Sequence, residues 1–276
     1  MRLQFQGIMM FDPVFYLFLQ FFMLYNGVAF TFQKNVQKVA NIKLAIAPVH
    51  DSLTKYVYLT FDDGPLPGTS NCIAVCQKQK VAASFFEVGL HQSRNGYGKN
   101  LYNRIIKDSL FMVANHSFTH AFYGDYINYY HQADSALQDF LKAKQTLQVN
   151  NNICRLPGNN AWNTQVAKRA SGLVRPLVKK LDSVGFNVVG WDLEWHFNKS
   201  GKPINTPENM AIMVDSLLLK NQTKTKNHLV ILMHDHMFRA SSDSLKLERM
   251  ITLIKQRKDI QFRKLTSYPG LKNQSD

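Results

Sequence analysis

A chain of 276 residues that is 45% hydrophobic and 12% aromatic can bury a sizeable core, which excludes a largely disordered protein. The formal net charge of +14 favours anionic surroundings such as nucleic acid, membrane phospholipid or an acidic polymer, although basic charge can also serve solubility alone. Lysine and arginine are scattered and form no long basic block with interleaved aromatic residues. We therefore expect no nucleic-acid partner.

The first segment of the chain is apolar: no charged residue occurs between residues 13 and 33. Such a run predicts a signal peptide, with Gly27-Val28-Ala29 as a small-x-small cleavage site, or an uncleaved membrane anchor, because about 20 apolar residues span a bilayer. A buried helix of the domain itself is the alternative. The lysines after the run oppose export by the positive-inside rule. We nevertheless expect residues 1–33 to direct export to the cell envelope (periplasm, membrane-anchored or secreted), with residues 34–54 as a linker.

Beyond the linker, strand-like and helix-like segments alternate. In chain order, we expect a strand at Tyr56–Phe61, a helix at Ser70–Lys80, strands at Ala82–Val88 and Leu110–Ala114 around a helix at Leu101–Lys107, a helix at His131–Val149, a strand at Ile153–Leu156, a helix at Thr164–Val184, a strand at Asn187–Trp191, a helix at Pro207–Leu219, a strand at Leu229–Met233, a helix at Ser244–Arg257 and a strand at Ile260–Leu265. This alternation predicts a parallel α/β fold, either an open sheet or a barrel, over residues 55–270.

Local signals support some of these boundaries. Thr164 and Thr206 are candidate N-caps, and Pro207 suits a first helical turn. Cys72, Cys76 and Cys154 are odd in number and form no CxxC pair, so we expect them in the core and not in a disulfide framework or a zinc knuckle.

Polar residues that can carry chemistry gather where the expected strands end. The groups are Asp62-Asp63-Gly64-Pro65, His116 to His120, Arg155 to Gly158, Asp192 to Trp195, and His234-Asp235-His236. In parallel α/β folds this rim forms active sites, so we expect these groups to converge.

The spacing of these groups suggests a metal site. Two adjacent carboxylates at a tight turn, Asp62 and Asp63, can point in different directions, so that one binds a metal while the other acts as a base. We expect His116 and His120 to share one face of a helical turn. Two histidines and one aspartate form a recurrent open metal site that leaves room for water and substrate.

The same groups, in the same order, resemble the five motifs of the polysaccharide deacetylase (NodB-homology) family, carbohydrate esterase family four. The resemblance covers about Lys55 to Leu265 and implies a distorted (β/α) barrel, often with seven strands. It implies a metal-dependent hydrolase that removes acetyl groups from an N-acetylated polysaccharide such as peptidoglycan, a chitin-like polymer or an exopolysaccharide.

The resemblance also implies roles for single residues. Asp62 is the expected catalytic base, His234 is the expected catalytic acid, and Asp63, His116 and His120 are the expected ligands of a divalent metal, usually zinc. Arg155 and the acid of the fourth motif, which we take as Asp192, tune the base and the acid. The substrate-binding residues are expected to be Pro157, Gly158, Trp195 and Leu232, the last two lining the acetyl pocket.

The chain departs from the family pattern in two motifs. The fourth motif has Glu194-Trp195 with Asp192 unusually spaced, which leaves open whether Asp192 or Glu194 partners Arg155. The third motif continues into Asn159-Asn160, where many relatives have an aromatic residue. Two other functions stay open: a catalytically inactive glycan-binding module, and an O-acetyl ester hydrolase that uses the same residues.

Overall fold

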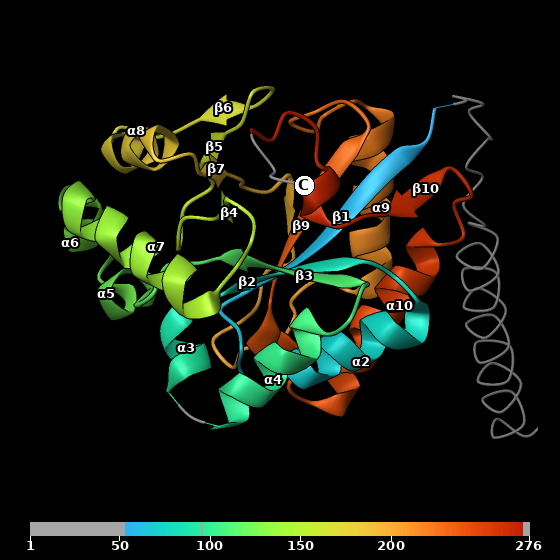
Figure 1. Ribbon diagram of the computed structural model, residues 1–276. Helices are drawn as coiled ribbons and strands as arrows, with labels where there is room; N and C mark the ends of the chain where they lie inside the picture. The colour runs from blue at the N-terminus through green and yellow to red at the C-terminus, as the bar shows by residue number, and fades with distance from the viewer. Residues whose placement is uncertain (1–52, 95, 273–276) are drawn as a thin grey trace, which may run out of the picture. The chain divides into compact units, whose positions relative to one another are not determined.

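Strand β1 (Lys55–Asp62) lies within a mostly parallel, curled sheet in the computed structural model, which describes residues 53–94 and 96–272 (Figure 1). The strand order is β6-β5-β7-β4-β3-β2-β1-β9-β8, and β10 pairs with the amino end of β1. The other strands are β2 (Ala83–Glu87), β3 (Phe111–Asn115), β4 (Ile153–Cys154), β5 (Trp162–Asn163), β6 (Lys168–Arg169), β7 (Asn187–Val188), β8 (Leu193–Glu194), β9 (His228–His234) and β10 (Ile260–Phe262). Their arrangement is an α/β half-barrel.

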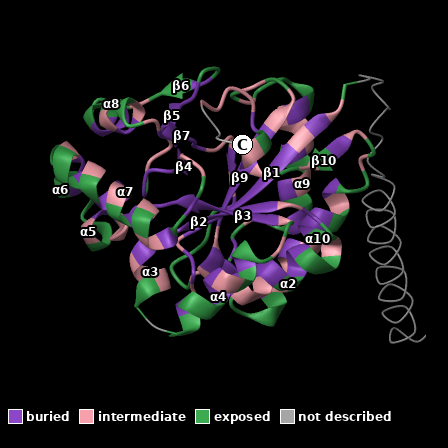
Figure 2. Cartoon of the chain, in the orientation of Figure 1, coloured by how far each residue is buried: buried purple, intermediate pink, exposed green. Residues whose placement is uncertain are grey.

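Helices connect the strands and cover the sheet. They are α2 (Thr69–Gln79), α3 (Gly89–Ser93), α4 (Gly96–Ile106), α5 (His120–Gly124), α6 (Tyr126–His131), α7 (Ala133–Leu147), α8 (Arg175–Ser183), α9 (Pro207–Leu219) and α10 (Ser241–Ile254), with 3₁₀ turns η1 (Asp235–Phe238) and η2 (Leu265–Ser267). Helix α10 packs against α9 and α2, whereas α7 packs against α8 and α3. Figure 2 shows the buried residues concentrated in the strands and on the helix faces that meet them.

The largest hydrophobic cluster lies between the sheet and helices α2, α9 and α10. Phe61 and Phe85 from neighbouring strands stack at 5.1 Å within it, and Met250 and Ile251 of α10 are fully buried. This packing holds the carboxyl ends of β1, β2 and β9 rigidly. Cys72, Cys76 and Cys154 are free and buried, which confirms the expectation that they pack in the core.

All seven expected strands are present, but the segment from Thr164 to Val184 is not one helix. Thr164 accepts a hydrogen bond from the Ala167 amide at 3.0 Å and so closes a turn between β5 and β6, and helix α8 begins only at Arg175. The N-cap prediction is therefore wrong for Thr164. It is confirmed for Thr206, whose hydroxyl accepts from the Asn209 amide at the start of α9.

The predictions for residues 1–33 and for most of the linker lie outside the described residues. Within the described part, no helix is both long and apolar enough to cross a membrane. The described residues belong to one compact unit that spans residues 52–276.

Candidate active site

Parallel pairing of β1 with β9 brings two of the expected catalytic side chains together. Asp62 and His234 are direct partners in the register, at the carboxyl ends of the two strands, and Thr60 is paired with Leu232 in the same way. Strands β2 and β3 continue the same edge, so the loop that follows Asn115 starts beside Asp62. The sheet therefore delivers residues far apart in sequence to one rim.

Asp63, His116 and His120 form a cluster of potential metal ligands. One ligand atom from each lies within 4.8 Å of the other two, and Oδ1 of Asp63 is 3.4 Å from Nε2 of His116 and 3.1 Å from Nε2 of His120. Among the described residues no donor points a proton at this oxygen in hydrogen-bond geometry. A buried acceptor that faces two imidazole nitrogens without a directed hydrogen bond suits a shared cation.

A backbone contact sets the ring of His116 for such a role. Nδ1 of His116 lies 3.0 Å from the carbonyl oxygen of Arg155, which fixes the proton on Nδ1 and leaves Nε2 free to ligate. Burial opposes ionisation of Asp63, but the neighbouring His116 and His120 rings outweigh it and hold the pKa of the Asp63 carboxyl well below its ordinary value. Two imidazoles and a carboxylate are a donor set that fits zinc.

The two histidines are not on one face of a helical turn, as the sequence spacing suggested. His116 follows β3 directly, and His120 begins a short turn whose residues have left-handed backbone angles, with φ of 53° at His120 itself. The carboxylate of Asp139 on α7 holds this loop by accepting hydrogen bonds from the amides of Phe118 and Thr119, each at 3.1 Å. The two imidazole rings lie close together because these hydrogen bonds to Asp139 of α7 fix the conformation of the loop.

Arg155 is fully buried and organises the side chain of Asp62. Its Nη1 donates to Oδ1 of Asp62 at 2.7 Å and to the hydroxyl of Thr60 at 2.8 Å. The remaining guanidinium donors go to backbone carbonyls at Val189 and Gly190. With Oδ1 fixed in this way, Oδ2 of Asp62 faces the metal cluster, 3.7 Å from Nε2 of His116.

The comparisons with known proteins match the part of the chain that carries most of these site residues. The family profile described as "Polysaccharide deacetylase" matches residues 50–173. The chain is 28% identical over 207 residues to a peptidoglycan-N-acetylglucosamine deacetylase of Bacillus cereus, a match that covers 72% of this chain and 66% of that protein. Over residues 50–173 the chain is thus similar to the polysaccharide deacetylase family.

Solved structures show the same similarity. The catalytic domain of a peptidoglycan N-acetylglucosamine deacetylase from Eubacterium rectale superposes with a TM-score of 0.57 at 26% identity, covering 81% of this chain and 94% of that one. A family 4 carbohydrate esterase from Streptomyces lividans, solved in complex with acetate, has a TM-score of 0.54 at 21% identity over 78% of this chain and 95% of that one. The second likeness shows the shared fold alone.

A pocket of about 220 Å³ opens above the deacetylase motifs. Its lining comprises Asp62, Asp63, His116, His120, Tyr126, Leu156, Gly158, Trp191, Glu194, Phe197, Leu232 and His234. Gly158 and Leu232 were expected there. Tyr126 and Phe197 were not, although both pack edge-on against site histidines, Tyr126 on His120 at 6.0 Å and Phe197 on His234 at 5.1 Å.

Two expected substrate-binding residues lie outside this pocket. Trp195 is fully buried: its indole donates a hydrogen bond to the carbonyl of Asn205, and its ring packs on Phe238. The tryptophan that lines the pocket is Trp191. Pro157 is also absent from the lining, and its carbonyl accepts a hydrogen bond from the hydroxyl of Tyr130.

The structure also separates the two acids of the fourth motif. Asp192 does not line the pocket; its carboxylate accepts hydrogen bonds from the amides of Lys224 at 2.6 Å and Val230 at 2.8 Å, and burial raises its pKa to about 6. Glu194 lines the pocket and lies 3.1 Å from Nδ1 of His196. Glu194 is thus the fourth-motif acid that lines the pocket, whereas both Glu194 and Asp192 interact electrostatically with Arg155.

The sequence did not predict a buried pair of acids that lies beneath the site. Glu87 and Asp235 are both fully buried, and within the described part of the chain neither oxygen of Glu87 has a hydrogen-bond partner. Asp235 accepts from the hydroxyl of Thr69. Burial foremost, and then the surrounding carboxylates, raises the pKa of both acids well above the ordinary range. The sequence does contain one sign of this pair: Glu87 is an acidic residue within the mostly apolar strand expected at residues 82–88.

Proposed function

We propose that this protein removes acetyl groups from the N-acetyl amides of a polysaccharide, with N-acetylglucosamine of peptidoglycan as the leading substrate. The observation that carries the proposal is the convergence of Asp62, Asp63, His116, His120 and His234 on one pocket. The likeness to the Bacillus cereus deacetylase supports the choice of polymer. The match spans less than two thirds of that relative's length, so the substrate is assigned by resemblance and needs a direct test.

Asp63, His116 and His120 would hold a divalent ion, and zinc suits their two nitrogens and one oxygen. When bound, zinc supplies Lewis-acid chemistry that polarises the amide carbonyl. The backbone contact at Nδ1 of His116 keeps that ring oriented for this role.

Asp62 is the proposed general base. Because Arg155 occupies Oδ1, the other oxygen is available to take the proton from an attacking water. Asp62 is buried except where it lines the pocket, and its pairing with Arg155 fixes the orientation of the carboxylate.

His234 is the proposed general acid, which gives a proton to the departing amine. It is half-buried in the same pocket, and its Nδ1 is a buried nitrogen without a hydrogen-bond partner among the described residues. The edge of Phe197 packs against its ring and limits its rotation. The proposed base and the proposed acid are thus delivered by two neighbouring strands, β1 and β9, to one pocket.

An O-acetyl ester hydrolase would use the same residues, because esters and amides pass through similar tetrahedral species. A catalytically inactive glycan-binding module is disfavoured by the presence of every side chain that the chemistry requires. We also propose that residues 1–33 direct export and that residues 34–54 link them to the domain, on the apolar run alone.

Acetate release from a panel of substrates tests the function. Peptidoglycan fragments, chitin oligomers, poly-N-acetylglucosamine and acetylated xylan would be assayed after chelation, with and without added zinc. We expect zinc-dependent release from an N-acetylated glycan. Release from acetylated xylan alone would establish an esterase, and no release from any substrate with zinc bound would establish a binding module.

A further inference from the structure

A second hollow, of about 550 Å³, lies at the opposite end of β1 from the pocket. Its charged lining residues are all basic: Lys80, Lys255, Arg257, Lys258, Arg263 and Lys264. We call these six residues, with the surface between them, the basic groove. It is formed by the end of α2, the end of α10 and the segment that contains β10.

Most of this charge is not neutralised within the domain. Arg257 is paired with Asp215 at 3.0 Å and with Asp259 at 2.5 Å. The ammonium groups of Lys255 and Lys264 donate only to backbone carbonyls, those of Gln79 and Ser109. In the described part of the chain, no carboxylate pairs with Lys80 or Lys258, and both are exposed. A concave surface that presents several unpaired cations is suited to phosphate groups.

Lys80 occupies a position at which another residue would fit better. It ends helix α2 with a left-handed φ of 53°, a conformation that favours glycine at a helix terminus. Backbone conformation therefore does not explain a lysine here, whereas its charge at the rim of the groove does.

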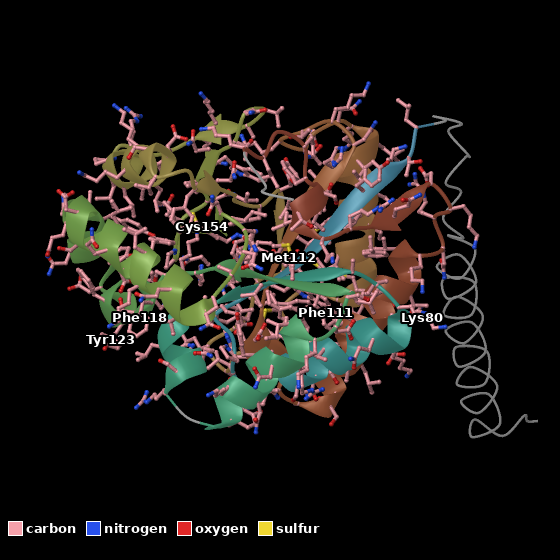
Figure 3. The ribbon with its side chains drawn as sticks, in the orientation of Figure 1. Lys80, Phe111, Met112, Phe118, Tyr123 and Cys154 are labelled. Carbon is pink, nitrogen blue, oxygen red and sulfur yellow. The ribbon has the colours of Figure 1, made fainter. Side chains whose placement is uncertain are left out.

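The groove lies beside the point where the chain enters the domain. Lys55, the first residue of β1, is paired with Ile260, and Tyr56 and Val57 are paired with Gln261 and Phe262 of the groove wall. Asp62, at the other end of β1, is about 23 Å away at roughly 3.3 Å per residue. Figure 3 shows the same separation, with Lys80 on one side of the domain and Phe118, in the metal-cluster loop, on the other.

The apolar run ends near residue 33, and only residues 34–54 separate it from Lys55 at the amino end of β1. The groove, beside that end of β1, is therefore close along the chain to the segment that we propose as a signal peptide or membrane anchor. We propose that the basic groove binds the phosphate headgroups of anionic membrane lipids and so orients the pocket outward. This goes beyond the proposed catalytic function and does not depend on it.

Lysine labelling of the full-length chain tests the proposal. The chain is reconstituted in nanodiscs of phosphatidylcholine alone or mixed with phosphatidylglycerol, treated with a water-soluble acetylating reagent, and analysed by mass spectrometry. We expect labelling of Lys80 and Lys258 to fall at least about threefold in the anionic discs and to recover near 1 M salt. Lys179, exposed on α8 at the far side of the domain in Figure 1, is the internal control and should not change.

A charge-removing variant separates the groove from general attraction. Lys255 also lines the groove and should be protected in wild type with the other two lysines. Lys80→Gly with Lys258→Gln should abolish this protection of Lys255, and the fold is preserved because glycine suits φ of 53°. The matched control, Lys179→Gln with Lys199→Gln, should leave it intact. Acetate release from a soluble oligosaccharide should be unchanged in both, which keeps this test apart from that of the catalytic proposal.

Four outcomes would overturn the proposal. Equal labelling of Lys80 and Lys258 in neutral and anionic discs, or no association with either disc, removes the lipid contact. An equal fall at Lys179 indicates non-specific attraction. Protection by soluble polyphosphate without any effect of phosphatidylglycerol assigns the groove to a free polyanion instead of a membrane.

Discussion

The carboxyl groups of Glu87, at the end of β2, and of Asp235, directly after β9, both lie against Gly64. A Cβ on residue 64 would lie 2.5 Å from Oδ2 of Asp235 and 2.6 Å from Oε1 of Glu87. Gly64 follows the proposed base and metal ligand directly, so this acid pair forms the floor on which the Asp62-Asp63 turn rests. Two fully buried acids this close cannot both be ionised without a large desolvation cost.

We expect the Glu87→Gln variant to be more stable than wild type at high pH. The raised pKa values mean that the folded state keeps protons that the unfolded chain releases above about pH 4. The free energy of unfolding therefore falls as pH rises from there toward the folded-state pKa. The amide keeps the neutral shape and removes one titration, so Tm at pH 8 should rise by about 2–4 °C, with little change near pH 4.

Melting curves of zinc-saturated protein between pH 4 and pH 8 measure this effect. Glu208→Gln, at an exposed position, is the matched control and should shift little at any pH. A lower Tm for Glu87→Gln across the whole range would mean that the pair is ionised and satisfied in the folded protein.

We expect Gly64→Ala to disturb the site at its base. The added methyl must displace two buried carboxylates, so we expect a loss of about 1–3 kcal/mol in the free energy of unfolding and a strong fall in acetate release. Gly96→Ala at the start of α4, where a Cβ meets nothing within 4 Å, is the control and should keep full activity. Denaturant titration and acetate assays on both variants decide the point; equal behaviour would contradict the packing argument.

Removal of either histidine of the cluster should abolish metal binding. His116→Ala and His120→Ala each leave two of the three ligands, so we expect zinc content to fall from one per chain to near zero. Elemental analysis after dialysis measures it. His91→Ala is a fitting control, because Nδ1 of His91 lies 2.7 Å from the backbone carbonyl of Asp63 and the ring is not among the ligand atoms of the cluster. Full zinc content in both cluster variants would place the ion elsewhere.

Asp62→Asn should separate chemistry from metal binding. The amide can keep the contact with Arg155 but cannot accept the proton of water, so turnover should fall by about 10²–10⁴-fold while zinc content stays at one per chain. Parallel measurement of kcat and bound zinc tests this. Normal turnover would show that the base is a different residue.

The reactive centre was predictable from sequence because its residues follow strand ends. Parallel pairing brings such ends to one edge whatever the loops do, so Asp62, Asp63, His116, His120 and His234 could be assigned to one site. The conformation of the His116–His120 loop could not be predicted, since its left-handed turn depends on anchoring by Asp139 from a distant helix. The Glu87–Asp235 pair likewise exists only through tertiary packing.

The assignment of Trp195 to the pocket conflicts with strand alternation. Leu193 in β8 and Trp195, which directly follows β8 and still bonds to the Leu232 carbonyl of β9, are two residues apart and so face the same side, and both are buried in the core. Glu194 must face the other side, where the pocket lies. Because side chains along a strand alternate between its two faces, the sequence alone already argues against Glu194 and Trp195 lining the same surface.

The two tryptophans should therefore respond differently to truncation. Trp191→Ala removes part of the pocket lining, so we expect a higher KM or lower kcat/KM for glycan. Trp195→Ala creates a cavity beside Phe238 in the main core, so it should cost about 3–5 kcal/mol of stability, more than the loss at Trp191. Steady-state kinetics and denaturant titration on both variants provide the comparison. A kinetic defect confined to Trp195→Ala, with Trp191→Ala unaffected, would return Trp195 to the acetyl pocket.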